Sequence, residues 1–587
     1  MTLWLILITI NNINMVQLHH LLISHFRGIE CFECVFNKGI TCIIGRGDSG
    51  KSTILDAIGL CFSQSWSIHL NDSDFFNTDT TNPIIIEGTV IDLPQDLIDK
   101  FSDHIRGVTL DGHVIDDMES EDAHTAQLAL TVQLKVGRDL EPIWSVISNH
   151  GIEPSMIKAT DRSKMNVFQL SDYTDRHFSL NKGNPLYSLY KELNNGEELD
   201  DDNRVLDVIR DAKEAFDNSV GNKFDSLIDR VKTEALKLGI SLNEMKAMLD
   251  HRDIAISENK VSIHENGIPL RLKGKGSKRI VSLAIQLAVT RPAGVILIDE
   301  IEQGLEPDRV QHLVNELAKN TDKQVIMTTH SSNVIVEVPC ESVYIKRSNN
   351  NSLLRVDREL QNCIRKNPEV FFATKVIVCE GVTEIGLCRA INKWRMKNGK
   401  LSAACNGVRF ADGGGNSLKN YVVGFNQLKY DTALFCDSDP QGDEINKLKP
   451  KFKNDGINVV DCETGLSIEG QIFKDAPWII VKELLKVYAE RLLDEKHSES
   501  IEEAYKSIFD SITSKMSTKP QWSDKWYENE SQDLRESIAA ISGKKSWFKR
   551  IDLGEKVGDC ILLHYSELEE NCHLKKEIDD LSGWMDS

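Results

Sequence analysis

The sequence lacks an excess of basic residues and any apolar run long enough to cross a membrane. It holds 69 lysines and arginines against 90 aspartates and glutamates, which gives a net charge of -21. Because polyanions bind basic surface, this balance excludes an extensive nucleic-acid coat and leaves only local basic patches. The apolar residues 3–10 are too short to span a bilayer and lack the flanks of an export signal. We expect a cytoplasmic protein with no membrane partner, whose residues 1–14 form an extended or disordered start ahead of Met15.

The sequence also lacks an organised set of cysteines. Its thirteen cysteines are scattered, and Cys42, Cys379 and Cys436 lie inside apolar segments, as reduced cysteines do in cytosolic proteins. Cys31 and Cys34 form one C-x-x-C, but no second pair follows at zinc-ligand spacing, so we interpret the pair as structural. The length of 587 residues predicts two to four domains.

Residues 295–300 (VILIDE) combine four aliphatic residues with two acids. Such a run predicts a strand buried on both faces, with Asp299 and Glu300 at its carboxyl end, where open α/β sheets bind ligands. Taken alone, the segment is equally compatible with a core strand followed by two helix-capping acids.

Residues 45–52 (GRGDSGKS) match G-x-x-x-x-G-K-[ST] in full and follow the apolar strand predicted at 40–44. Residues 51–61 then have helical spacing, and this strand–loop–helix setting favours a phosphate loop over an empty glycine-rich turn. Lys51 would reach the β- and γ-phosphates, and Ser52 would bind Mg²⁺ with Asp299, while Glu300 polarises the attacking water. The predicted nucleotide-binding residues of the loop are Gly45, Gly47, Gly50, Lys51, Ser52 and Thr53.

The segments around the loop predict further elements. Strands expected near residues 17–23, 31–36, 84–88 and 128–136 suit an antiparallel layer beside the nucleotide sheet. Between 151 and 255 an amphipathic helical pattern (Leu206, Ile209, Phe216, Val220, Phe224, Ile228, Val231, Ala235 and Leu238) predicts a helical insertion. The insertion would serve dimerisation, with ordinary core packing as the alternative.

Residues 272–279 (LKGKGSKR) place Gly276 and Ser277 at a basic helix start, which is a second anion-binding end. With 45–52, 295–300, GLEP at 304–307 and TTH at 328–330, they resemble the SMC-like branch of the ABC-type ATPases. The resemblance implies that two heads sandwich ATP, with Gly276 and Ser277 of one head capping the γ-phosphate held by Lys51 of the other. It also implies that His330 is the switch histidine, and it assigns 15–150 and 256–365 to the ATPase domain.

A second α/β unit is predicted over residues 370–587. Glu380 ends one apolar strand, Glu384 follows at a helix start, a second strand lies at 408–411, and Asp437 and Asp439 end a third. Acids at the carboxyl ends of neighbouring parallel strands converge on one edge, as a site for two hard divalent cations requires. An isolated D-x-D is usually a solvated loop, so the prediction depends on the combination.

This constellation resembles the Toprim domain, which implies that Glu380 is a general acid/base or metal-bridging residue and that Asp437 and Asp439 are metal ligands. Glu384 is similar to the second acid of the nuclease branch. We find no tyrosine module of a topoisomerase and no zinc or polymerising region of a primase.

An ABC-type ATPase fused to a Toprim domain resembles the OLD (overcoming lysogenisation defect) family, which includes the Gabija-type nucleases. The family implies a further metal-binding acid, for which Glu469 is the candidate, and a late catalytic lysine. Lys545 or Lys549 is that candidate, with a basic surface patch as the alternative. A helical insertion is expected at about 478–540.

The sequence therefore predicts an α/β protein in which an SMC-like ATPase domain precedes a Toprim domain. The expected function is ATP-regulated endonucleolytic cleavage of DNA in anti-phage defence, with Mg²⁺, Mn²⁺ or Ca²⁺ at the Toprim site. The expected partners are DNA, a second copy of the chain in a homodimer or larger homo-oligomer, and a defence-system protein or nucleic acid. DNA would lie over the basic runs at 271–279, 346–365 and 544–550. The alternatives are a nuclease for RNA such as tRNA, and a non-catalytic ATP-driven sensor or clamp.

Overall fold

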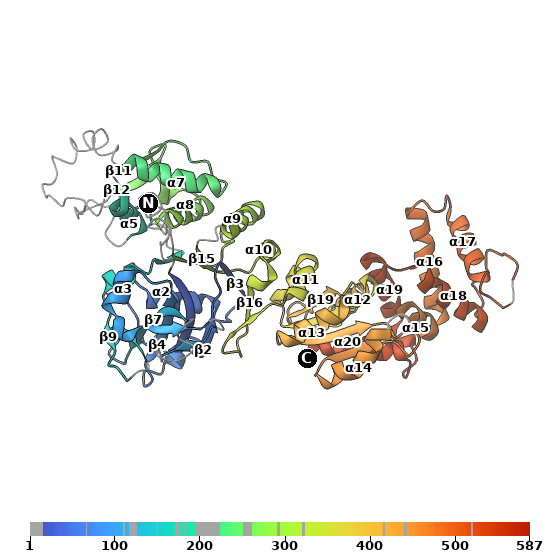
Figure 1. The fold of residues 1–587 in the computed structure, drawn as a ribbon. Coiled ribbons are helices and arrows are strands. Elements are labelled where there is room, and N and C mark those ends of the chain that lie inside the picture. The colour runs from blue at the N-terminus through green and yellow to red at the C-terminus, as the bar shows by residue number, and fades with distance from the viewer. Residues whose placement is uncertain are drawn as a thin grey trace, which may run out of the picture. The chain divides into compact units, whose positions relative to one another are not determined.

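The computed structural model (Figure 1) describes residues 16–65, 67–109, 112–116, 126–148, 151–170, 177–179, 184–193, 224–249, 261–289, 294–319, 323–414, 417–439, 443–517 and 520–587. The predicted start at 1–14 and the helical pattern at Leu206, Ile209, Phe216 and Val220 lie outside these residues. The chain divides into two compact units, Met1–Arg355 and Val356–Ser587. The second unit thus begins before the predicted junction at 365–370.

A six-stranded sheet in the first unit carries the nucleotide motifs. Its order is β10-β14-β15-β3-β16-β17, and every neighbouring pair is parallel except β16 with β17. All four residues of β14 are buried, as a strand covered on both faces requires. Its strands are β3 (Ile40–Ile44), β10 (Val167–Leu170), β14 (Val295–Ile298), β15 (Gln324–Thr328), β16 (Val343–Lys346) and β17 (Leu353–Arg355).

An antiparallel sheet of eight strands lies in the same unit, which confirms the predicted antiparallel layer. Its order is β2-β1-β4-β7-β5-β6, with β8 paired to β7 and β9 paired to β8. The strands are β1 (Gln17–Phe26), β2 (Ile29–Val35), β4 (Ile84–Ile91), β5 (Arg106–Val108), β6 (Val114–Ile115), β7 (Gln127–Val136), β8 (Pro142–Ile147) and β9 (Ser155–Met156).

Helix α2 (Lys51–Cys61) joins the two sheets through one apolar core. Its buried residues, among them Ile54 and Ile58, pack with side chains of β1, β4 and β7 on one side and of β14 and β15 on the other. Two hydrogen bonds from the Gln324 amide also join β15 to β1, since its nitrogen donates to Leu18 O and its oxygen accepts from Leu18 N, both at 2.8 Å. The core thereby fixes the amino end of α2, where the phosphate loop ends.

The stretch predicted as a helical insertion at 151–255 differs from that prediction at both ends. Residues 155–170 hold β9, α4 (Ala159–Ser163) and β10, and β10 pairs with β14 in the nucleotide sheet. β11 (Met245–Leu249) then forms a small antiparallel sheet with β12 (Val261–Glu265) and β13 (Ile268–Pro269). β10 is only four residues long and three of them are buried, so it shows neither helical nor alternating periodicity and carries no sequence signal of its own.

The described helices of the first unit lie in short segments between these strands. They are α2, α3 (Gln95–Lys100), α4 (Ala159–Ser163), α5 (Pro185–Leu193), α7 (Asp225–Lys237), α8 (Lys275–Val289), α9 (Pro307–Lys319) and α10 (Ser332–Glu337). Helix α8 begins five residues before the predicted helix at 280, so Gly276 and Ser277 lie in its first turn.

The second unit contains a four-stranded parallel sheet of order β19-β18-β20-β21, as the sequence predicts for a small α/β unit. The strands are β18 (Lys375–Cys379), β19 (Val408–Asp412), β20 (Asp431–Cys436) and β21 (Asn458–Asp461). The helices are α11 (Gln361–Lys366), α12 (Val382–Lys397), α13 (Leu418–Gln427), α14 (Asp443–Asn454), α15 (Ile468–Asp475), α16 (Trp478–Asp494), α17 (Ile501–Thr513), α18 (Gln532–Lys544), α19 (Ile551–Leu563) and α20 (His573–Asp586). Helices α16 to α18 occupy the helical stretch predicted at about 478–540.

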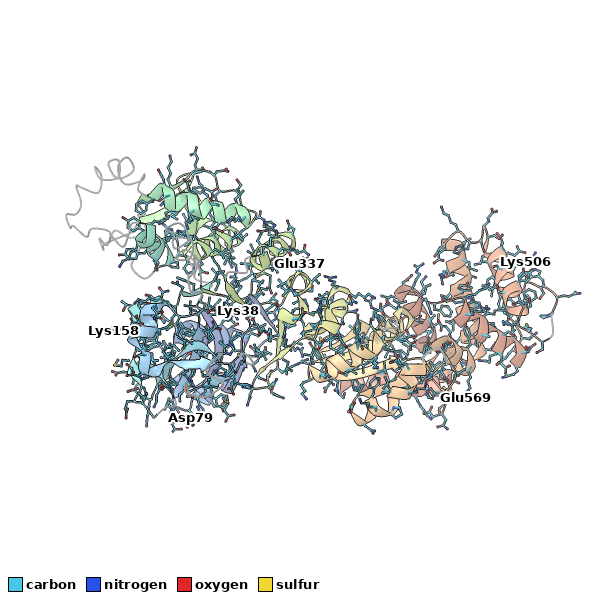
Figure 2. All side chains as sticks on the ribbon, in the orientation of Figure 1. Lys38, Asp79, Lys158, Glu337, Lys506 and Glu569 are labelled. Carbon is cyan, nitrogen blue, oxygen red and sulfur yellow. The ribbon has the colours of Figure 1, made fainter. Side chains whose placement is uncertain are left out.

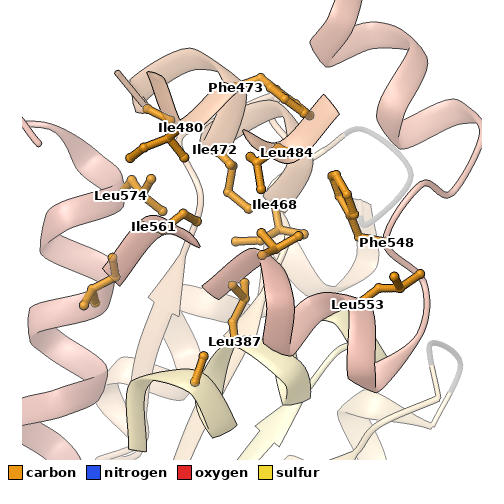
Figure 3. Packing of buried hydrophobic residues seen from close by; sticks show 14 of the residues in the cluster. Leu387, Ile468, Ile472, Phe473, Ile480, Leu484, Phe548, Leu553, Ile561 and Leu574 are labelled. Carbon is orange, nitrogen blue, oxygen red and sulfur yellow. The ribbon is translucent and has the colours of Figure 1, made fainter. Parts of the chain in front are cut away.

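The core of the second unit gathers side chains from helices far apart in sequence. Figure 3 shows Leu387 of α12, Ile472 of α15, Leu484 of α16 and Leu574 of α20 in this cluster. Helices α12 and α19 approach so closely that a Cβ at Gly386 would lie 2.5 Å from Glu555 N and Ile551 O. This packing holds the starts of α12 and α15 rigidly beside the sheet.

Candidate functional site

The phosphate loop runs between β3 and α2 as predicted. Gly50, the residue before α2, has φ 91°, a left-handed conformation that glycine adopts without steric cost. Lys51 is 5% exposed, and its Nζ donates to Gly45 O at 3.0 Å and to Arg46 O at 2.9 Å. Burial lowers the pKa of Lys51, while the charges of Asp299 and Glu300 oppose that shift. The Lys51 amine therefore donates to carbonyl oxygens of the phosphate loop itself. The phosphate oxygens of a bound nucleotide would compete with these carbonyls for the amine.

The predicted metal pair of this loop is assembled. Ser52 Oγ donates to Asp299 Oδ1 at 3.1 Å, although their positions lie far apart in the sequence. Thr328, at the end of β15, donates through Oγ1 to the same Asp299 oxygen at 2.5 Å and accepts from Glu300 N at 2.8 Å. One hydroxyl thus holds the Asp299 carboxylate and the Glu300 backbone, a role that the TTH motif at 328–330 did not predict for Thr328.

Two more side chains hold residues 299–302 and the loop that follows β15, and the sequence predicted this role for neither of them. Arg279 of α8, which is 5% exposed, donates to Glu300 O at 2.9 Å and to the Asp299 carbonyl. Glu302 accepts from Thr329 Oγ1 at 2.7 Å and from His330 N at 2.6 Å. Glu302 therefore fixes the loop that presents the predicted switch histidine. In the sequence, Glu302 is marked by its position two residues after Glu300.

The signature-like segment packs on its own unit. Gly276 lies so near the 304–307 turn that a Cβ there would be 2.3 Å from Gly304 O, so only glycine fits. Among the described residues, neither Gly276 nor Ser277 makes a hydrogen bond to the phosphate loop of the same chain. Their role toward a nucleotide held by a second chain stays a prediction.

In the second unit, the acids gather at the carboxyl edge of the parallel sheet. Glu380 follows β18 and Asp437 follows β20, and these strands are hydrogen-bonded neighbours. Glu380 Oε2 accepts from Asp437 N at 2.9 Å. Asp437 Oδ1 accepts from Ile468 N, in the first turn of α15, at 2.7 Å. The sheet edge and the amino end of α15 therefore orient these two carboxylates.

Glu384 and Glu469 complete the acidic group from the first turns of α12 and α15. Glu384 is 4% exposed, and its Oε2 accepts from Gly381 N at 3.0 Å. Burial, and then the charges of Asp437, Glu469 and Glu380, raise the pKa of Glu384 well above its usual range. Burial followed by the charges of Glu380 and Glu469 raises the pKa of Asp437 to about 7. The acids repel one another in a poorly solvated place, which is characteristic of a functional site.

A cavity of about 850 Å³ opens on this acidic group. Its lining includes Asp437, Asp439 and Glu469, together with small and basic residues of α18 and the segment after it. Lys549 lines the same cavity, and its charge opposes the rise that burial causes in the pKa of Glu469. Lys545 does not line it, and its Nζ donates to Ser511 Oγ at 2.6 Å in a different hollow. The structure therefore brings Lys549, and not Lys545, to the acids.

A buried lysine without a sequence signal supports the loop after β20. Lys449 of α14 is 7% exposed, and its Nζ donates to Asp437 O at 2.8 Å and to Ser438 Oγ at 2.7 Å. It also lies 3.1 Å from Asp461 Oδ2, at the end of β21. Lysines of an amphipathic helix are ordinarily exposed, so nothing in the local pattern marks this one.

The donor set fits a hard divalent cation. Glu469 Oε1 is buried with no hydrogen-bond partner among the described residues, so this residue of the acid-lined cavity keeps an unsatisfied acceptor. No group of three or more histidine, cysteine, aspartate or glutamate side chains in the described ranges is arranged so that it could by itself hold a metal ion. Mg²⁺ commonly keeps several waters and takes only one or two carboxylates beside substrate phosphates. An open acidic edge of this kind is consistent with that preference.

Two family models match this chain. The family model described as "AAA domain, putative AbiEii toxin, Type IV TA system" matches residues 40–337. The chain belongs to this AAA ATPase family. A second family model, "Overcoming lysogenization defect protein-like, TOPRIM domain", matches residues 371–439 of the same AAA-family chain. The predicted fusion of an ATPase domain with an OLD-like Toprim domain is confirmed, and with it the α/β fold class.

Individual relatives of this AAA–Toprim chain cover parts of it. The "Retron Vc95 probable ATPase" of Vibrio cholerae serotype O1 biovar El Tor is 24% identical over 359 residues, 52% of this chain and 69% of the relative. An SMC head bound to the C-winged helix domain of ScpA is 15% identical, covers 59% of this chain and 99% of that one, and has a TM-score of 0.37. RecF of the RecFOR pathway is 13% identical with the same coverages and a TM-score of 0.34.

The two matched domains support an enzyme that combines ATPase and nuclease machinery and uses a nucleotide and a divalent metal. The likeness to a retron ATPase and to a toxin–antitoxin family links the chain to defence-related proteins. Within the described part of the chain, no helix has the length and apolar character needed to cross a membrane.

Proposed function

We propose that this chain is an ATP-regulated, divalent-metal-dependent nuclease that cleaves DNA in anti-phage defence. The observation that carries the proposal is the gathering of Glu380, Glu384, Asp437 and Glu469 at one edge of the Toprim sheet, beside a cavity that Lys549 also lines. The raised pKa values of several carboxylates show that their negative charges are poorly compensated, so a bound cation would stabilise them. A phosphodiester with its metal ions supplies that charge balance.

The residues would divide the work as follows. Asp437, Asp439 and Glu469, with Glu380 and Glu384, would hold two divalent cations, with Mg²⁺ the expected ion and Mn²⁺ or Ca²⁺ as alternatives. When bound, such ions supply an activated water and stabilise the leaving oxygen. Lys549 would place its ammonium beside the reacting phosphate, where negative charge develops. The hydrogen bonds to Asp437 from Ile468 N–H and to Glu384 from Gly381 N–H would keep these acids in place.

The ATPase half would regulate access to this site. Lys51, Ser52, Asp299 and Glu300 would bind and hydrolyse ATP, with Mg²⁺ between Ser52 and Asp299. We propose that two chains pair around the nucleotide, with Gly276 and Ser277 of one meeting the phosphates held by the other. Pairing that depends on ATP and is prolonged by Glu300→Gln supports this arrangement, and a monomer in every nucleotide state contradicts it.

The deciding experiment incubates the purified chain with plasmid DNA, linear DNA and tRNA, with and without ATP, under Mg²⁺ and Mn²⁺. We expect DNA cleavage by the parent and a loss of at least about 100-fold in Glu380→Gln and Asp437→Asn, since each removes a charge from the acidic group. Cleavage of tRNA alone would favour the RNA nuclease. Cleavage of no substrate, with intact ATP hydrolysis, would favour the sensor or clamp.

A further inference from the structure

A second hollow lies beside the acid-lined cavity in the second unit. It has a volume of about 740 Å³ and is formed by α17, the residues just after it and the carboxyl end of α18. Lys544 lines both hollows, so the two meet at one side chain. Lys506, Lys515 and Lys545 line the second hollow with it, and we call this surface the lysine hollow. Lys506 is labelled on α17 in Figure 2.

The lysine hollow has four lysines against two acids, and no acid pairs directly with any of these lysines in the described part of the chain. Among the described residues, none of its four lysines makes an ion pair, and the Lys545 amine is held by the neutral hydroxyl of Ser511 at 2.6 Å. By contrast, Lys474 and Lys482 of the same unit are held by Glu463 and Glu528. A local excess of positive charge is unusual on a chain with a net charge of -21, and it attracts a polyanion.

The remaining lining of the hollow is polar and small. Ser507 and Ser511 of α17 and Ser514, the residue that follows the helix, line the hollow, and two acids, Glu503 and Asp510, lie among the lysines. The lining includes one aliphatic side chain, Ile541. A protein partner usually buries an apolar centre, so this composition favours a ligand that is recognised through its charge.

A row of phosphates suits these lysines, because they border one hollow from separate segments. Lys506 lies in α17, Lys515 lies two residues after its end, and both line the hollow with Lys544 and Lys545 of the α18 end. A nucleic-acid strand carries one phosphate at about every 3.4 Å, so a short length of strand can place several phosphates over such a surface. The phosphates of a strand that leaves the acid-lined cavity over Lys544 would meet these amines in succession.

We propose that the lysine hollow binds the part of the nucleic-acid strand that flanks the scissile phosphate. This inference rests on the proposed nuclease function and adds a substrate requirement to it. A strand long enough to reach the hollow binds more tightly than one confined to the acid-lined cavity. Lys545, which the sequence analysis offered as a catalytic lysine, then belongs to substrate binding.

The test uses the full-length double variant Lys506→Ala/Lys515→Ala and labelled single-stranded DNA of about 30 or about six nucleotides. Binding is measured against salt in EDTA, and cleavage is measured with Mg²⁺. We expect the longer strand to bind about tenfold more weakly, with a slope of log affinity against log salt smaller by about two. Cleavage of the short strand stays within about twofold of the parent, because neither lysine lines the acid-lined cavity.

The matched control is Lys451→Ala/Lys453→Ala, which removes the same charge from exposed positions on α14. Equal weakening in the control would show general attraction and overturn the proposal, as would unchanged long-strand binding in the test variant. Lys506→Arg/Lys515→Arg keeps the charge and should restore binding. Displacement of DNA by polyglutamate at equal charge would overturn the nucleic-acid assignment. A parent that binds long DNA as described but cuts nothing would refute the nuclease function alone.

Discussion

The acids of the Toprim edge make the stability of the metal-free chain depend on pH. The pKa of Asp437 is raised from 3.8 to about 7, first by burial and then by Glu380 and Glu469. Well below pH 3.8 Asp437 keeps its proton in both the folded and the unfolded forms, so the raised pKa does not lower the free energy of unfolding. As the pH rises, the unfolded form releases its proton first, and stability falls until the folded group also ionises near pH 7. Above that pH the loss of unfolding free energy no longer changes with pH.

The size of this effect follows from the shift. A rise from 3.8 to about 7 corresponds to at most about 4 kcal/mol at 1.36 kcal/mol per pH unit. Asp437→Asn removes the ionisation and keeps an oxygen that can accept from Ile468 N–H. We expect this variant in EDTA to be more stable than the parent by about 2 to 4 kcal/mol near pH 8 and by almost nothing near pH 4. Mg²⁺ should stabilise the parent more than the variant, because it compensates the ionised carboxylates.

The assay is urea unfolding followed by tryptophan fluorescence. Six of the nine tryptophans lie after residue 356, so the signal reports mainly on the second unit. Asp431→Asn is the control, since Asp431 begins β20 at the opposite end of the strand and is exposed. A gain for Asp437→Asn that is the same at pH 4 and pH 8, or no gain at either, would refute the burial and repulsion on which the prediction depends.

Three further substitutions test contacts that the structure identifies. Thr328→Val should lower ATP hydrolysis by about tenfold or more but change nucleotide affinity less than threefold, because the Thr328 hydroxyl orients Asp299 and is not part of the phosphate loop. Phosphate release measures the first and nucleotide titration the second, and equal losses in both would contradict this role. Gly386→Ala should cost about 1–3 kcal/mol of unfolding free energy by pushing α12 from α19, whereas Gly583→Ala, with open space, should cost nothing. Lys449→Met should cost about 1–3 kcal/mol in urea unfolding, since it removes two hydrogen bonds to the loop after β20 and an ion pair with Asp461, whose side chain is 27% exposed. An unchanged midpoint would refute that role.

The local motifs of the chain were predictable because their chemistry is contained in short segments. The phosphate loop with α2, the strand β14 before Asp299, and the Toprim strands before Glu380 and Asp437 all lie where the sequence places them. Each combines a buried aliphatic run with polar residues at its end, and burial of such a run restricts it to a central strand. The parallel order of the Toprim strands follows from the helices between them.

The tertiary structure decided which distant side chains meet. It placed β10 beside β14, brought Thr328 to Asp299, set Lys449 beneath the Asp437 loop and assigned Lys549 rather than Lys545 to the acid-lined cavity. None of these contacts is encoded within a single segment, because each depends on how helices and strands far apart in the chain pack together. The sequence determined the chemistry available at each strand end, and packing determined which groups act on the same atoms.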